Sequence, residues 1–200
     1  YVGRPETDQV RGMAMNLLGL GLSEAGHHED ALSVKEAELS MLRRLGAPEE
    51  HLLFTQSNLA ATYARLGRLE EAFRLNRDVY SGRLKLNGEE DEETLLEGCN
   101  YTLSLLSLKH FEEAKSLLLK TVPVARRVLG ESSEITLRMR WNYAAALIKA
   151  SGATLDDLHE SVTTLEEVER TARRVLGGAH PATVGIEHCL RGARAVRAHV

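Results

Sequence analysis

The sequence predicts an all-α protein made of tandem helix hairpins, and three observations support this prediction. Two sets of residues recur every 42 positions, namely Asn58, Asn100, Asn142 and Gly46, Gly88, Gly130. Apolar residues follow the period of an amphipathic helix, and strand-type alternation is absent. Many segments also end in basic residues followed by glycine, which suits a helix dipole and a left-handed C-cap.

Each repeating unit is expected to contain two helices joined by a tight turn. The first helix is rich in Ala and Leu, and the second begins with an acidic pair and a small residue, as in Glu70-Glu71-Ala72. The turns fall at Gly26, Gly67 and Lys109. A lone hairpin cannot bury its apolar face, so neighbouring units must stack into one domain over residues 1–200. The expected elements are four repeats at 8–53, 54–95, 96–137 and 138–180, and a terminal helix at 181–198.

Two irregularities interrupt the pattern. The fourth unit is five residues longer, since Gly177 follows Gly130 by 47 positions, and the loop around Gly152 is the expected place for the extra residues. Pro123 falls inside the second helix of the third unit, where it removes a backbone donor and crowds the preceding turn. Because the apolar period resumes at Val124, we expect a kink there and not a helix end.

Composition indicates a folded protein with no general affinity for nucleic acid. The chain has 200 residues, of which 43% are hydrophobic, and its net charge is −4. No apolar stretch approaches the roughly 20 residues that a membrane span needs. No signal peptide is visible, although a leader or further domains could precede Tyr1. Cys99 and Cys189 form no disulfide framework, which indicates a reducing compartment, and we expect the cytoplasm.

Two segments resemble the tetratricopeptide repeat. They are NLAATYARLGRLEEA at 58–72 and NLLGLGLSEAGHHEDAL at 16–32, with Gly19 and Ala31 at the two small-residue packing positions. The period of 42 and the segment LGGAHPAT at 176–183 are similar to the longer repeats of kinesin light chains. The pattern is broken at three positions, where Thr102 and Ser161 replace small packing residues and Lys109 replaces the turn glycine.

The resemblance implies a right-handed α-α superhelix whose first helices line a concave groove. Such grooves bind extended or helical peptide segments of partner proteins, without catalysis and without a cofactor. Helical spacing through each recurring Asn then selects one face of each first helix. The candidate groove residues are Phe54, Asn58, Ala61 and Arg65, then Leu96, Asn100 and Leu103, then Arg138, Asn142, Ala145 and Lys149.

The roles of these side chains have two interpretations each. In related repeats an Asn at this position bonds the main chain of the peptide, but it can equally bond a neighbouring helix. Arg65, Arg138 and Lys149 favour an acidic segment by charge complementarity, or they are simply solvated charges. Trp141 either stacks on the ligand or packs between repeats.

Other chemistries find little support in the sequence. Adjacent His27-His28 and His188-Cys189 point in different directions on a helix, so no metal site is expected. The arginine pairs that recur at helix ends fit helix electrostatics better than an RNA or lipid ridge. The alternative functions are a ligand-responsive regulatory module beside an effector domain and, less favoured, an enzyme that uses Cys99, Cys189 or a histidine. Self-association through the end helices is compatible with the main interpretation.

Overall fold

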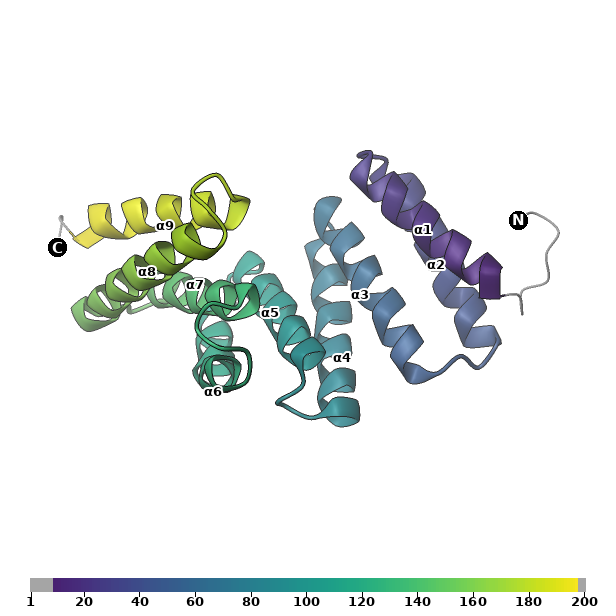
Figure 1. The fold of residues 1–200 in the computed structure, drawn as a ribbon, viewed down its shortest axis with the longest axis horizontal. Helices are drawn as coiled ribbons and strands as arrows, with labels where there is room; N and C mark the ends of the chain where they lie inside the picture. The colour runs from purple at the N-terminus through teal and green to yellow at the C-terminus, as the bar shows by residue number, and fades with distance from the viewer. Residues whose placement is uncertain (1–8, 198–200) are drawn as a thin grey trace. The chain divides into compact units, whose positions relative to one another are not determined.

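The computed structural model describes residues 9–197, and this part of the chain consists of α-helices joined by short turns (Figure 1). The predicted start of the first repeat, at residue 8, and the predicted end of the terminal helix, at residue 198, lie outside these described residues. The helices, in chain order, are α1 (Gln9–Glu24), α2 (His28–Arg44), α3 (Glu49–Arg65), α4 (Leu69–Asn87), α5 (Glu92–Ser107), α6 (Phe111–Leu129), α7 (Glu134–Lys149), α8 (Leu155–Val175) and α9 (Pro181–Arg197). The all-α prediction is therefore confirmed.

The helices form two compact units, which are described separately. The N-terminal unit extends to Leu86 and contains α1 to α4, and the C-terminal unit begins at Asn87 and contains α5 to α9. The predicted unit boundaries after residues 53, 95 and 137 fall inside α3, α5 and α7. A period alone does not fix where a repeat begins, because every window of the same length repeats equally well. The single domain over 1–200 stays a prediction.

A ladder of small residues near the start of each second helix lets the two helices of a pair approach closely. Ala31, Ala72, Ala114 and Ser161 are each 1% exposed or less. The first helices supply the opposite side, where Ala60 and Ala144 are completely buried. Ser161 satisfies its hydroxyl by donating to the Ala144 carbonyl at 2.9 Å. The packing positions predicted at Ala31, Thr102 and Ser161 are thus buried.

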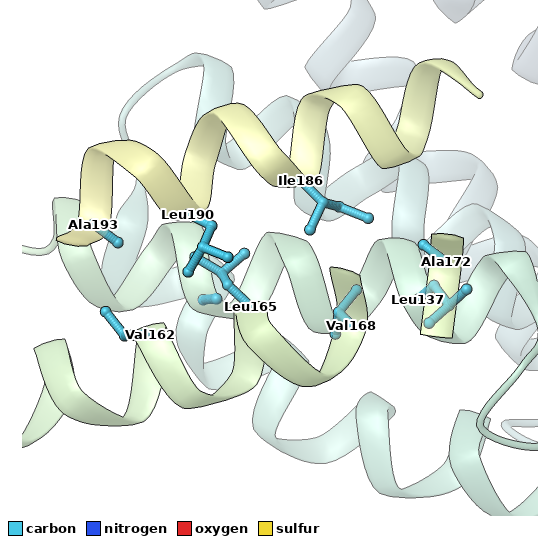
Figure 2. Close-up of a cluster of buried hydrophobic side chains, with 9 residues drawn as sticks. Leu137, Val162, Leu165, Val168, Ala172, Ile186, Leu190 and Ala193 are labelled. Carbon is cyan, nitrogen blue, oxygen red and sulfur yellow. The ribbon is translucent and has the colours of Figure 1, made fainter. Parts of the chain in front are cut away.

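The C-terminal unit has an apolar core at the α7–α8–α9 contact (Figure 2). Leu165 and Val168 of α8 pack there against Leu137 of α7 and Ile186 of α9. A second cluster joins α5, α6 and α7 around Leu118 and Met139. Together these clusters fix the three helices that face the candidate site described below.

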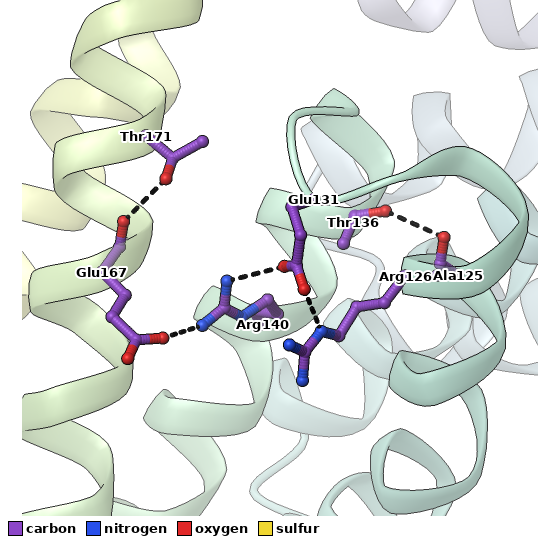
Figure 3. A network of polar contacts seen from close by, with 7 residues as sticks. All are labelled: Ala125, Arg126, Glu131, Thr136, Arg140, Glu167 and Thr171. Atoms are coloured by element: carbon purple, nitrogen blue, oxygen red, sulfur yellow. Dashed lines mark hydrogen bonds and ion pairs between the residues drawn. The ribbon is translucent and has the colours of Figure 1, made fainter.

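Arg140 joins three segments of the C-terminal unit at the edge of this core (Figure 3). Its buried guanidinium donates to Glu131, in the α6–α7 turn, and to Glu167 of α8. Glu131 also accepts from Arg126, near the end of α6. A half-exposed carboxylate on each side keeps the buried charge paired, which avoids the large cost of an isolated ion.

Lys109 takes the left-handed conformation that glycine takes in the other helix-joining turns. Its φ is 65°, and Gly67 at the matching turn has a φ of 74°. Both turns close in the same way, since His110 donates to the Leu105 carbonyl at 2.8 Å and Arg68 donates to Tyr63 at 2.9 Å. The departure from the glycine pattern therefore changes the residue but not the geometry.

The extra residues of the fourth unit are shared between a turn and a helix. The Ala150–Thr154 turn is two residues longer than its counterparts, and α8 begins three residues earlier relative to the small-residue ladder. Thr154 and Asp157 form a reciprocal capping box at the new helix start. In α6 the helix continues through Pro123 to Leu129, so the proline does not end it, as expected.

Polar residues replace apolar ones inside the N-terminal unit. In each second helix, the residue four positions after the small ladder residue is buried. It is Lys35 or Asn76 in the N-terminal unit, and Leu118 or Leu165 in the C-terminal unit. Lys35 is 3% exposed, and its ammonium donates to Ser23 Oγ, Asn58 O and Thr62 Oγ1 at 3.1, 3.3 and 2.8 Å. Its bonded neighbours are therefore neutral oxygens, and burial lowers its pKa.

Glu38 follows Lys35 by one helical turn and is also buried, at 5% exposure. Burial raises the pKa of its carboxyl to about 7, against the opposing effects of Lys35 and of a hydrogen bond from Asn16. One carboxyl oxygen, Oε2, is buried without a hydrogen-bond partner in the described structure. The N-terminal unit therefore contains a titratable group inside its helix packing.

We predict that Lys109→Gly stabilises the C-terminal unit by about 1 kcal/mol, because glycine adopts a positive φ without the steric cost that other residues carry. Lys109→Ala is the control, since alanine retains that cost and should change little. The measurement is the free energy of unfolding in urea. An equal gain for both variants would contradict this account of the turn.

We predict that the N-terminal unit loses stability as the pH rises from 5.5 to 8. The folded state holds the Glu38 proton more tightly than the unfolded state, so stability present at low pH is lost as pH rises through about 7. The loss across this range should be roughly 2 kcal/mol, because about 1.5 pKa units of the shift lie above pH 5.5, at about 1.4 kcal/mol per pKa unit. Glu38→Gln should remove it. Unfolding followed at both pH values tests this, and an unchanged pH dependence in Glu38→Gln would refute it.

Candidate functional site

A cavity of about 750 Å³ lies in the C-terminal unit among α5, α7 and α9. These are the first helices of successive pairs, with α9 in the place of the next first helix. Its size is within the usual range of ligand pockets, about 300 to 1,000 Å³. The lining residues used below are Leu103, Leu106, Ser107, Arg138, Trp141, Asn142, Ala145, Ile148, Lys149, Gly185, His188, Cys189, Gly192, Ala193 and Val196.

The cavity is mainly apolar, and its formal charges are positive. Apolar atoms make up most of its exposed lining, which includes leucine, tryptophan, isoleucine and valine side chains. Arg138 and Lys149 are the charged residues of the lining, and no Asp or Glu belongs to it. They lie eleven residues apart on α7, which corresponds to about 16 Å along a helix. The cavity is thus a hydrophobic hollow with a cation towards each end of one wall.

Five of the eleven predicted groove residues line this cavity, namely Leu103, Arg138, Asn142, Ala145 and Lys149. Leu96 and Asn100 are partly exposed on α5 but are not part of the lining. The other four belong to the N-terminal unit, where Phe54, Ala61 and Arg65 are exposed and Asn58 is half-buried. The predicted groove residues therefore include most of the α7 wall of this cavity and one residue of the α5 wall.

The recurring asparagines do not share one environment. Asn142 is 8% exposed, and its amide nitrogen donates across to Thr102 Oγ1 of α5 at 3.2 Å. Asn100 donates to Glu97 of its own helix at 3.1 Å. The Asn58 amide nitrogen is buried and has no hydrogen-bond partner among the described residues. Contact with a neighbouring helix, the second interpretation above, is what the structure shows for Asn142.

Arg65 is paired within the N-terminal unit. Its guanidinium donates to the Ser23 carbonyl at 3.2 Å and to the Glu24 carboxylate at 3.3 Å. Arg138 and Lys149, in contrast, form no ion pair with another residue of the described range. Of the three cations chosen from the sequence, the two that line the cavity are therefore the two without an ion pair in the described range.

Sequence reasoning missed the α9 wall of the cavity. Each of the four predicted groove residues on α7 has a counterpart 47 positions later on α9. All four counterparts line the cavity, namely Gly185, Cys189, Gly192 and Val196. The spacing between Gly130 and Gly177 carried this information, but the α9 residues lack the recurring Asn and so were not assigned to the stripe. A side chain at Gly185 would collide with the Trp141 ring, which makes that glycine necessary for the indole to pack there.

The cysteine environments oppose nucleophilic chemistry. Burial raises the pKa of Cys99 to about 11, and burial also raises that of Cys189. Both thiols are therefore held protonated near neutral pH, the reverse of an activated nucleophile. Both are free cysteines. Over residues 9–197, no group of three or more His, Cys, Asp or Glu side chains has the arrangement of a metal site.

Comparison with known proteins agrees with the fold described above. The family model for the tetratricopeptide repeat matches residues 55–93, which cover most of α3 and all of α4. This is a tetratricopeptide-repeat fold. No curated protein sequence matches the chain. Among the helices of the described range none is long and apolar enough to cross a membrane.

Solved structures extend the likeness to nearly the whole chain. Nearly identical tetratricopeptide-like repeats from a Podospora anserina protein described as a kinesin light chain give a TM-score of 0.74 at 20% identity, covering 96% of this chain and 90% of that one. A variant of the same protein gives 0.76 at 20% identity, with 94% and 87% covered. BtubC (BKLC) from P. vanneervenii gives 0.57 at 18%, with 96% and 83% covered. The resemblance to kinesin light chain repeats is thus confirmed at the level of the fold.

We predict that Asn142→Ala lowers the free energy of unfolding of the C-terminal unit by about 1 to 2 kcal/mol, because it leaves buried polar groups without a partner. Asn100→Ala removes only a bond within its own helix and should cost less than about 0.5 kcal/mol. Urea unfolding of the two variants makes the comparison. Equal costs would show that the α5–α7 bond of Asn142 contributes nothing.

Proposed function

We propose that the chain is a non-catalytic interaction module whose C-terminal unit binds a peptide segment of a partner protein in the α5–α7–α9 cavity. Tetratricopeptide repeats generally mediate interactions between proteins, and typically act without catalysis. The observation that carries the proposal is the cavity itself, which combines an apolar surface with two cations that form no internal ion pair. An exposed apolar surface and unpaired cations contribute little to the stability of the fold, but both can contribute to the binding of a ligand.

The chemistry of the lining favours a segment that is both apolar and acidic. Leu103, Trp141 and Ile148 offer surface that a ligand would remove from water, which is the main driving force for such binding. Arg138 and Lys149 would attract carboxylates and repel basic segments, so they contribute specificity more than affinity. We expect dissociation constants on the order of micromolar for one linear segment, since ordering it costs entropy.

Trp141 provides a direct readout, because it is the one tryptophan of the sequence and lines the cavity. We predict that a peptide with leucines between two glutamates changes its fluorescence, and that the same peptide with lysines in place of glutamates binds about ten-fold more weakly at low salt. Arg138→Gln and Lys149→Gln should each weaken binding about three- to ten-fold. These differences should shrink as salt rises.

Lys120→Gln is the matched control, since Lys120 is exposed on α6 and is not part of the cavity. It should leave binding unchanged. Equal affinity for the acidic and basic peptides, with no effect of salt, would refute the acidic preference. Absence of binding by every apolar peptide would refute the groove itself.

A further inference from the structure

The polar groups of the cavity restrict the backbone conformation of its occupant. An extended segment presents an N–H and a C=O at every residue, and each needs a partner once it is removed from water. The lining offers few uncharged polar side chains, namely Ser107, Trp141, Asn142, His188 and Cys189, and the Trp141 indole N–H is already bonded to Cys189. The amide nitrogen of Asn142 is already donated to Thr102. The main chains that form the walls are helical, so most of their own hydrogen bonds are also made internally.

A helical occupant has no such need, because it satisfies its backbone internally. It would contribute only side chains to the apolar surface, as in the helix-in-groove type of recognition. The α9 wall suits this arrangement. Towards the end of α9, Gly192 carries no side chain into the cavity and Ala193 carries one methyl group, next to the larger side chain of Val196. A side chain added at Gly192 would meet nothing within 4 Å, so a ligand can approach the α9 backbone closely at this position.

The two cations set the length of the segment. Arg138 and Lys149 lie about 16 Å apart along α7, from the helical rise of 1.5 Å per residue. In a helical ligand, carboxylates at this separation are eleven positions apart, with apolar residues on the same face between them. In an extended ligand the same distance corresponds to about five positions, at 3.3 Å per residue.

From the cavity, its cations and its shortage of free backbone partners, we infer that the occupant is an amphipathic helix of about three turns. Its apolar face lies against Trp141, Ala145 and Ile148, with an acidic residue near each end facing Arg138 and Lys149. This inference rests on the proposed function and specifies the partner class for that same cavity. It requires no backbone recognition by the recurring asparagines.

The test uses three designed peptides and the fluorescence of Trp141. The helical probe has fifteen residues, with glutamates at its second and thirteenth positions, leucines at its fifth, sixth and ninth, and alanine and glutamine elsewhere. The second probe is identical except for a proline at its eighth position, which breaks the helix without changing charge or leucine content. The third has glutamates five positions apart around a central proline and suits an extended conformation.

We expect the helical probe to bind and the proline variant to bind at least about ten-fold more weakly. Gly192→Leu should fill the cavity and weaken the helical probe by about ten-fold or more. This variant should fold, because the position is open and leucine favours a helix over glycine. Gly21→Leu is the matched control, since Gly21 is a helical glycine of α1 with equally open surroundings and lies outside the cavity.

The outcomes distinguish a failure of the helical inference from a failure of the proposed function. If the extended probe binds as tightly as the helical one, and Gly192→Leu blocks both, the helical inference is wrong while the groove stands. If no probe binds, the proposed function fails with it. If the helical probe binds but Gly192→Leu and Gly21→Leu behave alike, the peptide binds elsewhere and the inference is overturned.

Discussion

Close packing at one small residue in each second helix is the constraint on which the rest of the structure depends. The ladder of Ala31, Ala72, Ala114 and Ser161 has almost no exposed surface, so nothing larger fits without separating the paired helices. With that spacing set, the pairs of each unit stack, and their first helices are brought side by side. The cavity is a consequence of this stacking, because its walls are first helices that approach one another without filling the space between them.

The two units use the same geometry with different interiors. Lys35 lies at a position where the C-terminal unit buries Leu118 and Leu165, and Glu38 lies at a position where it buries Thr121 and Val168. Buried ionisable groups add less stability than the apolar residues they replace, even when they are hydrogen-bonded. Stability in a repeat array is close to a sum of local terms. The N-terminal unit therefore holds a buried carboxyl whose pKa is raised to about 7, whereas the α7–α8–α9 cluster of the C-terminal unit is apolar.

The proposed binding surface depends on an open position on α9 and on polar groups that are already hydrogen-bonded. Gly192 on α9 leaves open space beside the α7 wall, and Asn142 directs its amide nitrogen to Thr102. The resulting hollow offers hydrophobic area and two cations but few free donors or acceptors. A surface of this kind discriminates by shape and charge, because each unpaired backbone group of a bound ligand would cost free energy.

The sequence by itself determined the all-α class, the helix pairs, the packing ladder and the position of the turn at Lys109. These follow from local periodicity and from the spacing of small residues, which a single chain displays directly. Only the tertiary structure decided which of the predicted stripe residues share a cavity, that Arg65 is paired with Glu24, and that α9 completes the walls. These facts depend on side chains from helices distant in sequence. A period aligns the equivalent residues of each helix but does not show which of them meet in space.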